Sequence, residues 1–193
     1  HDLLLNTHLD YIKAGAEVIV TTTFATRKVR LLENNILDKF DYLNLKACEI
    51  AKKTKEYYPN ILIAGGLPPQ NSTYKVDDRA ENKIGEDFYN QAKLLNPFID
   101  FFYLDVLSSF KEIKIALDRT KEFNKPYLIG IHISKGTKLP SGEKISDIIN
   151  RLKDQKLLGV ILSCVSPENY ELNINEIKNI GIPFGFKLNG YLQ

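Results

Sequence analysis

The hexapeptide Gly159-Val160-Ile161-Leu162-Ser163-Cys164 decides how the rest of the sequence is interpreted. Its apolar residues lie between a glycine and a following Ser-Pro pair, which is typical of a buried strand. Cys164 would then stand at the carboxyl end of that strand, where α/β folds carry their chemistry. The simpler interpretation is a small buried hydrophobic residue, because free cysteines are among the most buried residues.

Composition narrows the class of protein. The chain has 193 residues, 44% of them hydrophobic, which suits one globular domain with its own core. Its 26 basic and 24 acidic residues nearly balance, so charge favours neither a nucleic acid nor a membrane as partner. No apolar run approaches the ~20 residues needed to span a bilayer. We expect no signal peptide, and two cysteines without a disulfide framework indicate the reducing cytoplasm.

Strand-like and helix-like segments alternate along the whole chain. The patterns predict strands at 16–23, 61–64, 98–104, 127–133, 159–164 and 183–188. They predict helices at 2–14, 26–32, 40–57, 84–95, 108–123, 144–156 and 167–180. Residues 70–82 are polar and aperiodic, which indicates a loop over one mouth of the fold.

This alternation predicts an α/β fold, a partial TIM (β/α)8 barrel with about six parallel strands. A complete barrel takes about 250 residues, so we expect the first and eighth units to be missing. Those units are neighbours in a closed barrel, and their loss would open one contiguous seam. No break in composition suggests a linker, so residues 1–193 are expected to form a single, incomplete barrel domain.

Polar or small residues follow the predicted strands at their carboxyl ends. In a parallel barrel these ends converge on one mouth, where catalytic groups come from several strands. The candidate substrate-binding residues are therefore Thr23, Phe24, Gly65, Gly66, Asp105, Ser134 and Asn189.

Most of these positions also have a structural interpretation. The threonines are good strand formers, and Gly65-Gly66 is typical of a turn. Asp105 is costly to bury without a partner, so a ligand, a helix cap and a salt bridge stay open. His132 would face either the barrel or the helices. Lys187 would either point to solvent or act as a Schiff-base lysine.

Several segments together match the pattern of a known family. His8–Phe24 (HLDYIKAGAEVIVTTTF) closely matches H-x-x-Y-x-x-A-G-A-[DE]-x-I-x-T-x-T-[FY]. Residues 63–69 resemble an A-G-S-x-G-P turn, and residues 100–106 resemble a D-x-x-x-x-E-T strand end. Residues 159–164 resemble a G-x-N-C strand, and residues 186–190 weakly resemble a P-N-A-G segment. Glu112 falls where the following helix usually has Glu. In this order, the segments resemble the homocysteine S-methyltransferase family, which includes betaine-dependent and cobalamin-dependent enzymes.

The resemblance implies zinc-dependent transfer of a methyl group from a donor to the thiol of homocysteine or a similar thiol. In the family, three Cys thiolates hold the zinc ion, which binds the substrate sulfur, and Cys164 matches the first of them. A free thiol has a pKa of about 8.5, and bound zinc deprotonates it. Asp105 occupies the place of the carboxylate that binds the substrate's amino group.

The chain also departs from the family pattern. The D-G-G loop and the paired cysteines of G-G-C-C lie outside the sequence, and Asp105-Val106 and Gly66 replace Glu-Thr and Ser. One thiolate does not make a zinc site, so we expect this chain to bind zinc weakly or not at all and to be inactive alone. The alternatives are a divergent barrel that only binds an amino-acid-like ligand, and a lysine-dependent aldolase-like enzyme using Lys187. The methyl donor and the oligomeric state stay open.

Overall fold

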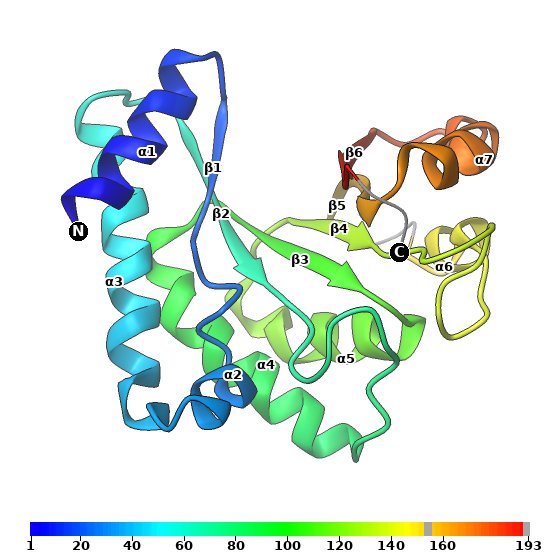
Figure 1. Cartoon of the computed structure of the whole chain (residues 1–193), viewed down its shortest axis with the longest axis horizontal. Helices are drawn as coiled ribbons and strands as arrows, with labels where there is room; N and C mark the ends of the chain where they lie inside the picture. Colours follow the sequence, from blue (N-terminus) through cyan, green and yellow to red (C-terminus); the bar gives the residue numbers. More distant parts are fainter. Residues whose placement is uncertain (153–155, 191–193) are drawn as a thin grey trace.

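The fold is a single curled sheet with helices on its outer side (Figure 1). The computed structural model describes residues 1–152 and 156–190. Six strands follow one another in sequence order and pair in parallel throughout. They are β1 (Val18–Val20), β2 (Leu62–Leu67), β3 (Phe101–Leu107), β4 (Tyr127–Ile131), β5 (Leu157–Val165) and β6 (Phe184–Leu188). The prediction of a partial (β/α)8 barrel with about six parallel strands is confirmed.

Helices make the crossovers that parallel strands require. They are α1 (Asp2–Lys13), α2 (Lys28–Glu33), α3 (Phe40–Lys53), α4 (Glu81–Leu95), α5 (Phe110–Thr120), α6 (Ile145–Asn150) and α7 (Pro167–Lys178). Short 3-10 turns lie at Leu37–Lys39, Thr54–Glu56, Asn96–Phe98 and Lys121–Phe123. The predicted loop is confirmed from residue 70 to residue 80, where the described backbone forms neither helix nor strand.

The main core lies between the sheet and the helices. Ile63, Leu104, Ile129 and Leu162 of four successive strands are fully buried there against helix residues. Cys48 of α3 belongs to the same core, as predicted, and burial raises the pKa of its thiol to about 12. A thiol in this state packs as an apolar group and is chemically inert.

A second, smaller cluster lines the inner, concave side of the sheet. It contains strand residues alone: Ala64, Phe101, Tyr103, Leu128 and Ile161. Because side chains alternate along a strand, the residues between them face the helices. The inner face of the sheet is therefore apolar along its length, up to the carboxyl ends of the strands.

The first strand is shorter and more exposed than the sequence predicts. β1 covers three of the eight residues expected at 16–23, and Val18 and Val20 are 38% and 40% exposed. β1 lies at the edge of the sheet, so no described strand covers its other side. After Val20, the N–H of Thr21 still donates to the carbonyl of Ala64, and the side chains of Thr21 and Thr23 then bond to Gly66 of β2.

Three other predicted boundaries are corrected. β2 continues through Gly65 and Gly66, which the sequence places in a turn. β3 begins at Phe101, after a 3-10 turn that contains Pro97, and runs to Leu107. The helix predicted at 144–156 ends at Asn150, and its residues 153–155 lie outside the described residues.

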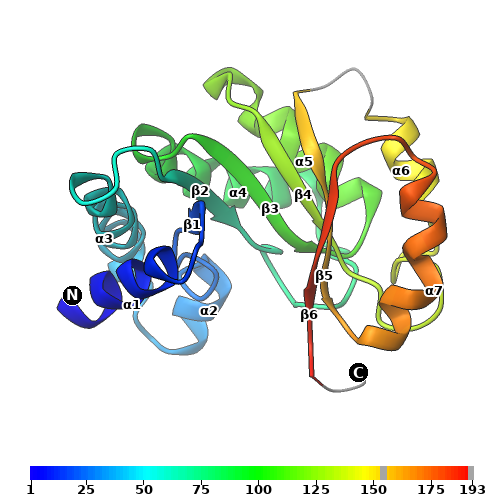
Figure 2. The ribbon, with the colours of Figure 1, turned by 90° about the horizontal axis from the view of Figure 1, so that it is seen from above.

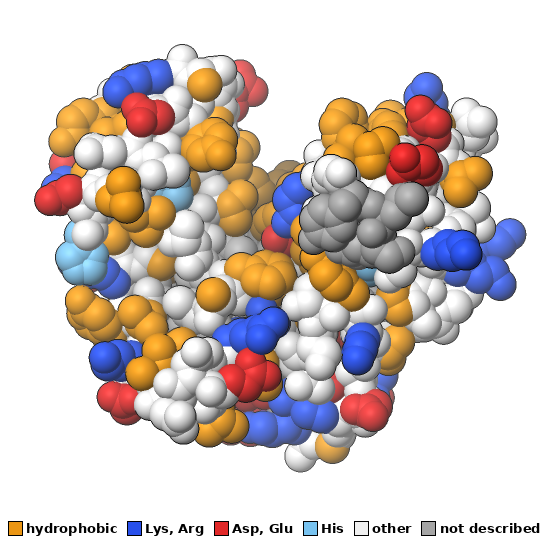
Figure 3. Space-filling view, viewed as in Figure 1, with side chains coloured by type: hydrophobic (Ala, Val, Ile, Leu, Met, Phe, Trp, Pro, Cys, Tyr) orange, Lys and Arg blue, Asp and Glu red, His pale blue; other side chains and the backbone are white. Residues whose placement is uncertain are grey.

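The two ends of the sheet do not meet. From above, β1 and β6 lie at opposite ends of the curled sheet (Figure 2), and the molecular surface is hollowed between the two sides (Figure 3). Phe184, Phe186 and Leu188 of β6 are exposed like the valines of β1. None of the described helices is long and apolar enough to cross a membrane.

Candidate functional site

Two strands carry an extra residue close to their carboxyl ends. In β3 the register with β4 shifts between Leu104 and Leu107, and Val106 has φ +64°. In β5 the register with β6 shifts between Ser163 and Val165, and Cys164 has φ +56°. A left-handed conformation is uncommon for any residue except glycine and exceptional for valine. These two β-bulges re-aim side chains at the strand ends, as bulges beside active sites do.

The bulges surround a polar group on the inner face, which we call the opening cluster: Tyr103, Asp105, Ser163, Cys164 and Lys187. The hydroxyls of Tyr103 and Ser163 are hydrogen-bonded at 2.6 Å. Lys187 Nζ donates to both carboxylate oxygens of Asp105, each at 2.7 Å. Lys187 pairs in register with Ser163 of the neighbouring strand, and its side chain links β6 to β3.

The electrostatics of Tyr103 connect the two bulges. Burial raises the pKa of the Tyr103 hydroxyl well above its ordinary value, and the charges of Asp105 and Cys164 raise it further. The phenol therefore remains protonated at neutral pH. Tyr103 lies two residues before Asp105 and bonds to Ser163, the neighbour of Cys164, so the carboxylate and the half-buried thiol come from adjoining segments of the two bulged strands.

His132 lies behind the cysteine and is fully buried. Its Nδ1 lies 3.2 Å from the carbonyl oxygen of Ser163, which only accepts, so Nδ1 carries the proton. Burial lowers the pKa of His132, which favours the neutral ring. Nε2 then accepts a hydrogen bond from the Ser134 hydroxyl at 2.8 Å. His132 therefore supports the backbone next to Cys164, and the ring of Tyr74 packs against it at a tilt, with the ring centres 4.4 Å apart.

Asn189 and Ser134 also act on the backbone around the opening. Asn189 Nδ2 donates to the carbonyl of Cys164 at 3.2 Å, and its N–H donates to the carbonyl of Val165 at 2.8 Å. The carbonyl of Ser134 accepts from Asn169 Nδ2 at 2.7 Å. Both residues follow a strand, as the sequence predicts. Their hydrogen bonds, however, go to the protein backbone near the bulge of β5 and to α7.

Thr23 and Gly66 connect the ends of the first two strands. The Thr23 hydroxyl is fully buried and donates to the carbonyl of Gly66 at 2.7 Å, and Gly66 N–H donates to Thr21 Oγ1 at 3.0 Å. Gly66 pairs with Tyr103 and so lies on the inner face. Gly65 faces the helices, where a Cβ would lie 2.5 Å from Ile99 Cδ1. Gly65 is therefore a packing residue.

Arg27 is a buried structural residue beside the site that the sequence did not reveal. It is 1% exposed, and its guanidinium lies 5.0 Å from the centre of the Phe24 ring. Its N–H groups donate to the carbonyls of Phe24 and Asn71 and to the hydroxyl of Thr73. Arg27 thus holds the 70–80 loop, whose Tyr74 covers His132. The sequence places Arg27 in the first turn of the helix predicted at 26–32, where a charged side chain is usually exposed to solvent.

The described residues do not fit a zinc site. They contain no group of three or more His, Cys, Asp and Glu side chains placed to hold a metal ion. Cys164 is accompanied at the opening by Asp105, but both oxygens of that carboxylate are bonded to Lys187. The same ion pair disfavours the Schiff-base alternative, because a Schiff base forms from a free amine rather than from an ammonium bonded to two oxygens.

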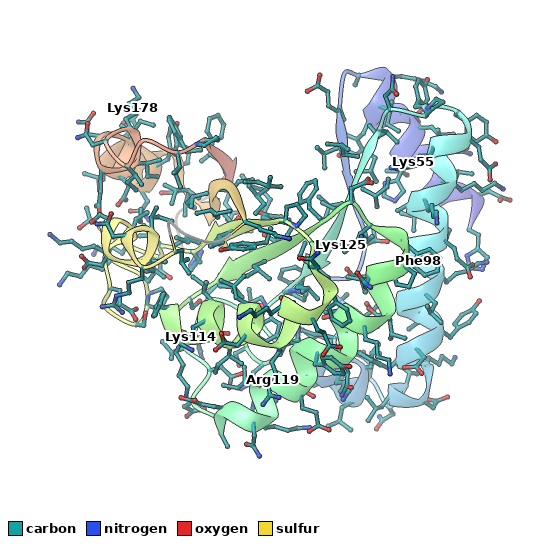
Figure 4. All side chains as sticks on the ribbon, turned by 180° about the vertical axis from the view of Figure 1, so that it is seen from behind. Lys55, Phe98, Lys114, Arg119, Lys125 and Lys178 are labelled. Carbon is teal, nitrogen blue, oxygen red and sulfur yellow. The ribbon has the colours of Figure 1, made fainter. Side chains whose placement is uncertain are left out.

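A separate cavity of about 430 Å³ lies on the outer side, between α5 and the end of α6. Lys114 and Lys125, labelled in Figure 4, line it together with Arg151. None of the predicted site residues is among its lining residues. The outer cavity is therefore separate from the sequence-predicted residues.

A curled parallel sheet that sets a thiol and a carboxylate at the carboxyl ends of its strands has the layout of a (β/α)8-barrel active site. The model of the homocysteine S-methyltransferase family matches residues 1–192, and the chain belongs to this family. The predicted resemblance is thereby confirmed.

Curated relatives match part of the chain. It is 27% identical over 134 residues to "S-methylmethionine--homocysteine S-methyltransferase BHMT2" of Pongo abelii, covering 69% of this chain and 35% of that protein. The Mus musculus protein of the same name is 27% identical over 123 residues, covering 63% and 32%. The chain thus spans about a third of the length of these relatives.

Solved structures show the same fold. The homocysteine methyltransferase MmuM from Escherichia coli superposes with a TM-score of 0.81 in its metallated form and 0.73 in its apo form. Each covers 99% of this chain and 81% of the other, at 17% identity. At this identity the likeness establishes the fold alone.

Proposed function

We propose that residues 1–193 form one homocysteine-binding-type barrel domain, which takes part in methyl transfer to the thiol of homocysteine or a similar thiol. Family membership supports the reaction class. The observation that supports the proposal is the pair of matched bulges, which lie beside Asp105 and at Cys164, at the carboxyl ends of β3 and β5. A cytoplasmic location is part of the proposal, since both cysteines are free thiols.

The proposed reaction moves one methyl group between two sulfur atoms. The substrate thiol loses its proton, and its sulfur forms a bond to the methyl carbon of the donor. The bond between that carbon and the donor sulfur breaks, and its electron pair stays on the donor, which leaves as a neutral thioether. We propose a sulfonium compound such as S-methylmethionine as the donor, because the curated relatives are named for it.

The residues of the opening divide into two roles in this proposal. Asp105 and Cys164 face the substrate, and Asn189 holds the backbone of Cys164 in place. Zinc dependence, which the family resemblance implies, would use Cys164 as one ligand. Because the described residues supply no three-ligand group, we propose that zinc binding needs ligands other than these residues.

A ligand titration tests the proposed site on the chain as it stands. We expect small thiols, homocysteine among them, to shift the amide NMR signals of Asp105, Ser163 and Cys164, and sulfur-free butanoate to bind more weakly. Cys164→Ser should weaken thiol binding, whereas Cys48→Ala, which removes the other thiol from the core, should not. Shifts confined to the outer cavity around Lys114 would contradict the proposed site.

The second candidate function is a divergent barrel that binds an amino-acid-like ligand without chemistry. It is favoured by the single sulfur ligand that the opening offers. Incubation with S-methylmethionine, a thiol and Zn²⁺ separates the two functions, with mass spectrometry of the methylated thiol as readout. Methylated product above the rate without protein supports transfer, whereas thiol binding without product in the complete gene product supports the second function.

A further inference from the structure

The ion pair at the opening carries an inference about the substrate. Asp105 is the only carboxylate of the opening cluster, and both of its oxygens are bonded to Lys187 Nζ at 2.7 Å. The Asp105 side chain is 10% exposed and that of Lys187 is 44% exposed. Lys187 Nζ also lies 5.6 Å from the centre of the Tyr103 ring, which attracts a cation. A cation of the chain itself therefore occupies the one carboxylate of the opening cluster with which the ammonium group of a substrate could pair.

An incoming ammonium group gains little at this position. To reach Asp105 it must displace Lys187, so one charged hydrogen-bonded pair replaces another of the same kind. The displaced ammonium of Lys187 remains attached to β6, beside the new cation, and like charges at short range repel. The ion pair thus opposes a substrate that carries an amino group next to its carboxylate.

An incoming carboxylate meets a different situation. A lysine ammonium has three N–H donors, and Asp105 takes two of them. The third is available for a ligand, because close to half of the Lys187 side chain is exposed. A carboxylate that binds there adds a charge-assisted hydrogen bond without breaking the existing pair.

We propose that Lys187 is a specificity-determining residue, which makes the site select a thiol with a carboxylate but no neighbouring ammonium group. The inference rests on the proposed function, since it assumes that a thiol is the acceptor. It changes the substrate class from an α-amino acid to a mercapto-carboxylic acid. The probes are homocysteine and 4-mercaptobutanoate, which is homocysteine without its amino group.

Calorimetry or NMR titration of the unmodified chain is the first test, and it needs no variant. We expect 4-mercaptobutanoate to bind about tenfold more tightly than homocysteine, a difference of about 1.4 kcal/mol. Lys187→Met frees Asp105 for the amino group, so the preference should reverse in favour of homocysteine. The matched control is Lys178→Met, which removes the same charge from an exposed position at the end of α7 (Figure 4).

Removal of Lys187 leaves a buried carboxylate unpaired, so a second variant guards against misfolding. The double variant Asp105→Asn with Lys187→Met carries neither charge and should bind the two thiols about equally. Two outcomes overturn the inference alone. One is that homocysteine binds to the unmodified chain as tightly as 4-mercaptobutanoate. The other is that the ratio of the two affinities is the same in Lys187→Met as in Lys178→Met. Equal binding of sulfur-free butanoate, or no binding of either thiol, overturns the proposed function as well.

Discussion

Glu112 of α5 provides a sharp test of the structure, because it is a carboxyl group without any exposed surface. Its Oε2 accepts a hydrogen bond from the Ser109 hydroxyl at 3.2 Å, and Oε1 has no partner among the described residues. Burial raises the pKa of Glu112 from 4.5 to about 7, and the charge of Asp77 adds to this, against the bond from Ser109 and the charge of Arg79.

The sign of the resulting pH dependence follows from proton binding. Between pH 4.5 and about 7 the unfolded chain has lost the Glu112 proton while the folded chain keeps it. Stability therefore falls as pH rises through this window, and the contribution of Glu112 does not change with pH below or above it. The pKa difference corresponds to a total of about 3 kcal/mol, of which about 1 kcal/mol is already lost at pH 5.

Glu112→Gln removes the charge and keeps the shape of the side chain. We expect the variant to gain stability relative to the unmodified chain by about 2 kcal/mol more at pH 8 than at pH 5. Urea unfolding of both proteins at the two pH values measures this difference, and groups that titrate in both cancel. The control is Glu86→Gln, whose side chain is 62% exposed. An equal effect of Glu112→Gln at both pH values would refute the argument.

Three further perturbations test the site. Gly130→Ala would place a Cβ 2.5 Å from Ser163 Oγ and 3.0 Å from the carbonyl oxygen of Leu104. We expect urea unfolding to show that the free energy of unfolding falls by about 1–3 kcal/mol. Unchanged stability would show that β4 separates easily from the neighbouring strands. Arg27→Met removes the bonds to the 70–80 loop, so amide hydrogen exchange there should accelerate while that of β4 stays the same; equal protection in both proteins would show that other contacts hold the loop. The chain dialysed against zinc should contain well under one ion per molecule by atomic absorption, and one tightly held ion that Cys164→Ser removes would reveal ligands beyond those described.

The sequence was sufficient for the fold because the fold depends on local patterns. Apolar runs and helical periodicity alternate six times, and each predicted strand exists in the structure. Gly65 and Gly66 show where this reasoning fails. Glycine pairs favour turns, but here a neighbour on either face of the strand leaves no room for a side chain at Gly65 and little at Gly66.

The contents of the site were predictable in part. Asp105 and Cys164 were identified because strand ends converge in a parallel barrel. The partner of Asp105 was not identified, because Lys187 lies 82 residues further along the chain and meets it through the curvature and register of the sheet. The left-handed conformations of Val106 and Cys164 have no local sequence signal, since neither residue is a glycine or an asparagine.

The paired bulges also separate two kinds of evolutionary change. Each one inserts a residue and then returns the strand to its former alternation, so that Leu107 and Val165 rejoin the layer beneath the helices. A substitution at the half-buried Cys164 can therefore alter the surface of the opening while Leu107 and Val165 keep their places in the core, whereas Val106 is fully buried. The two faces of such a strand end can thus change independently of each other.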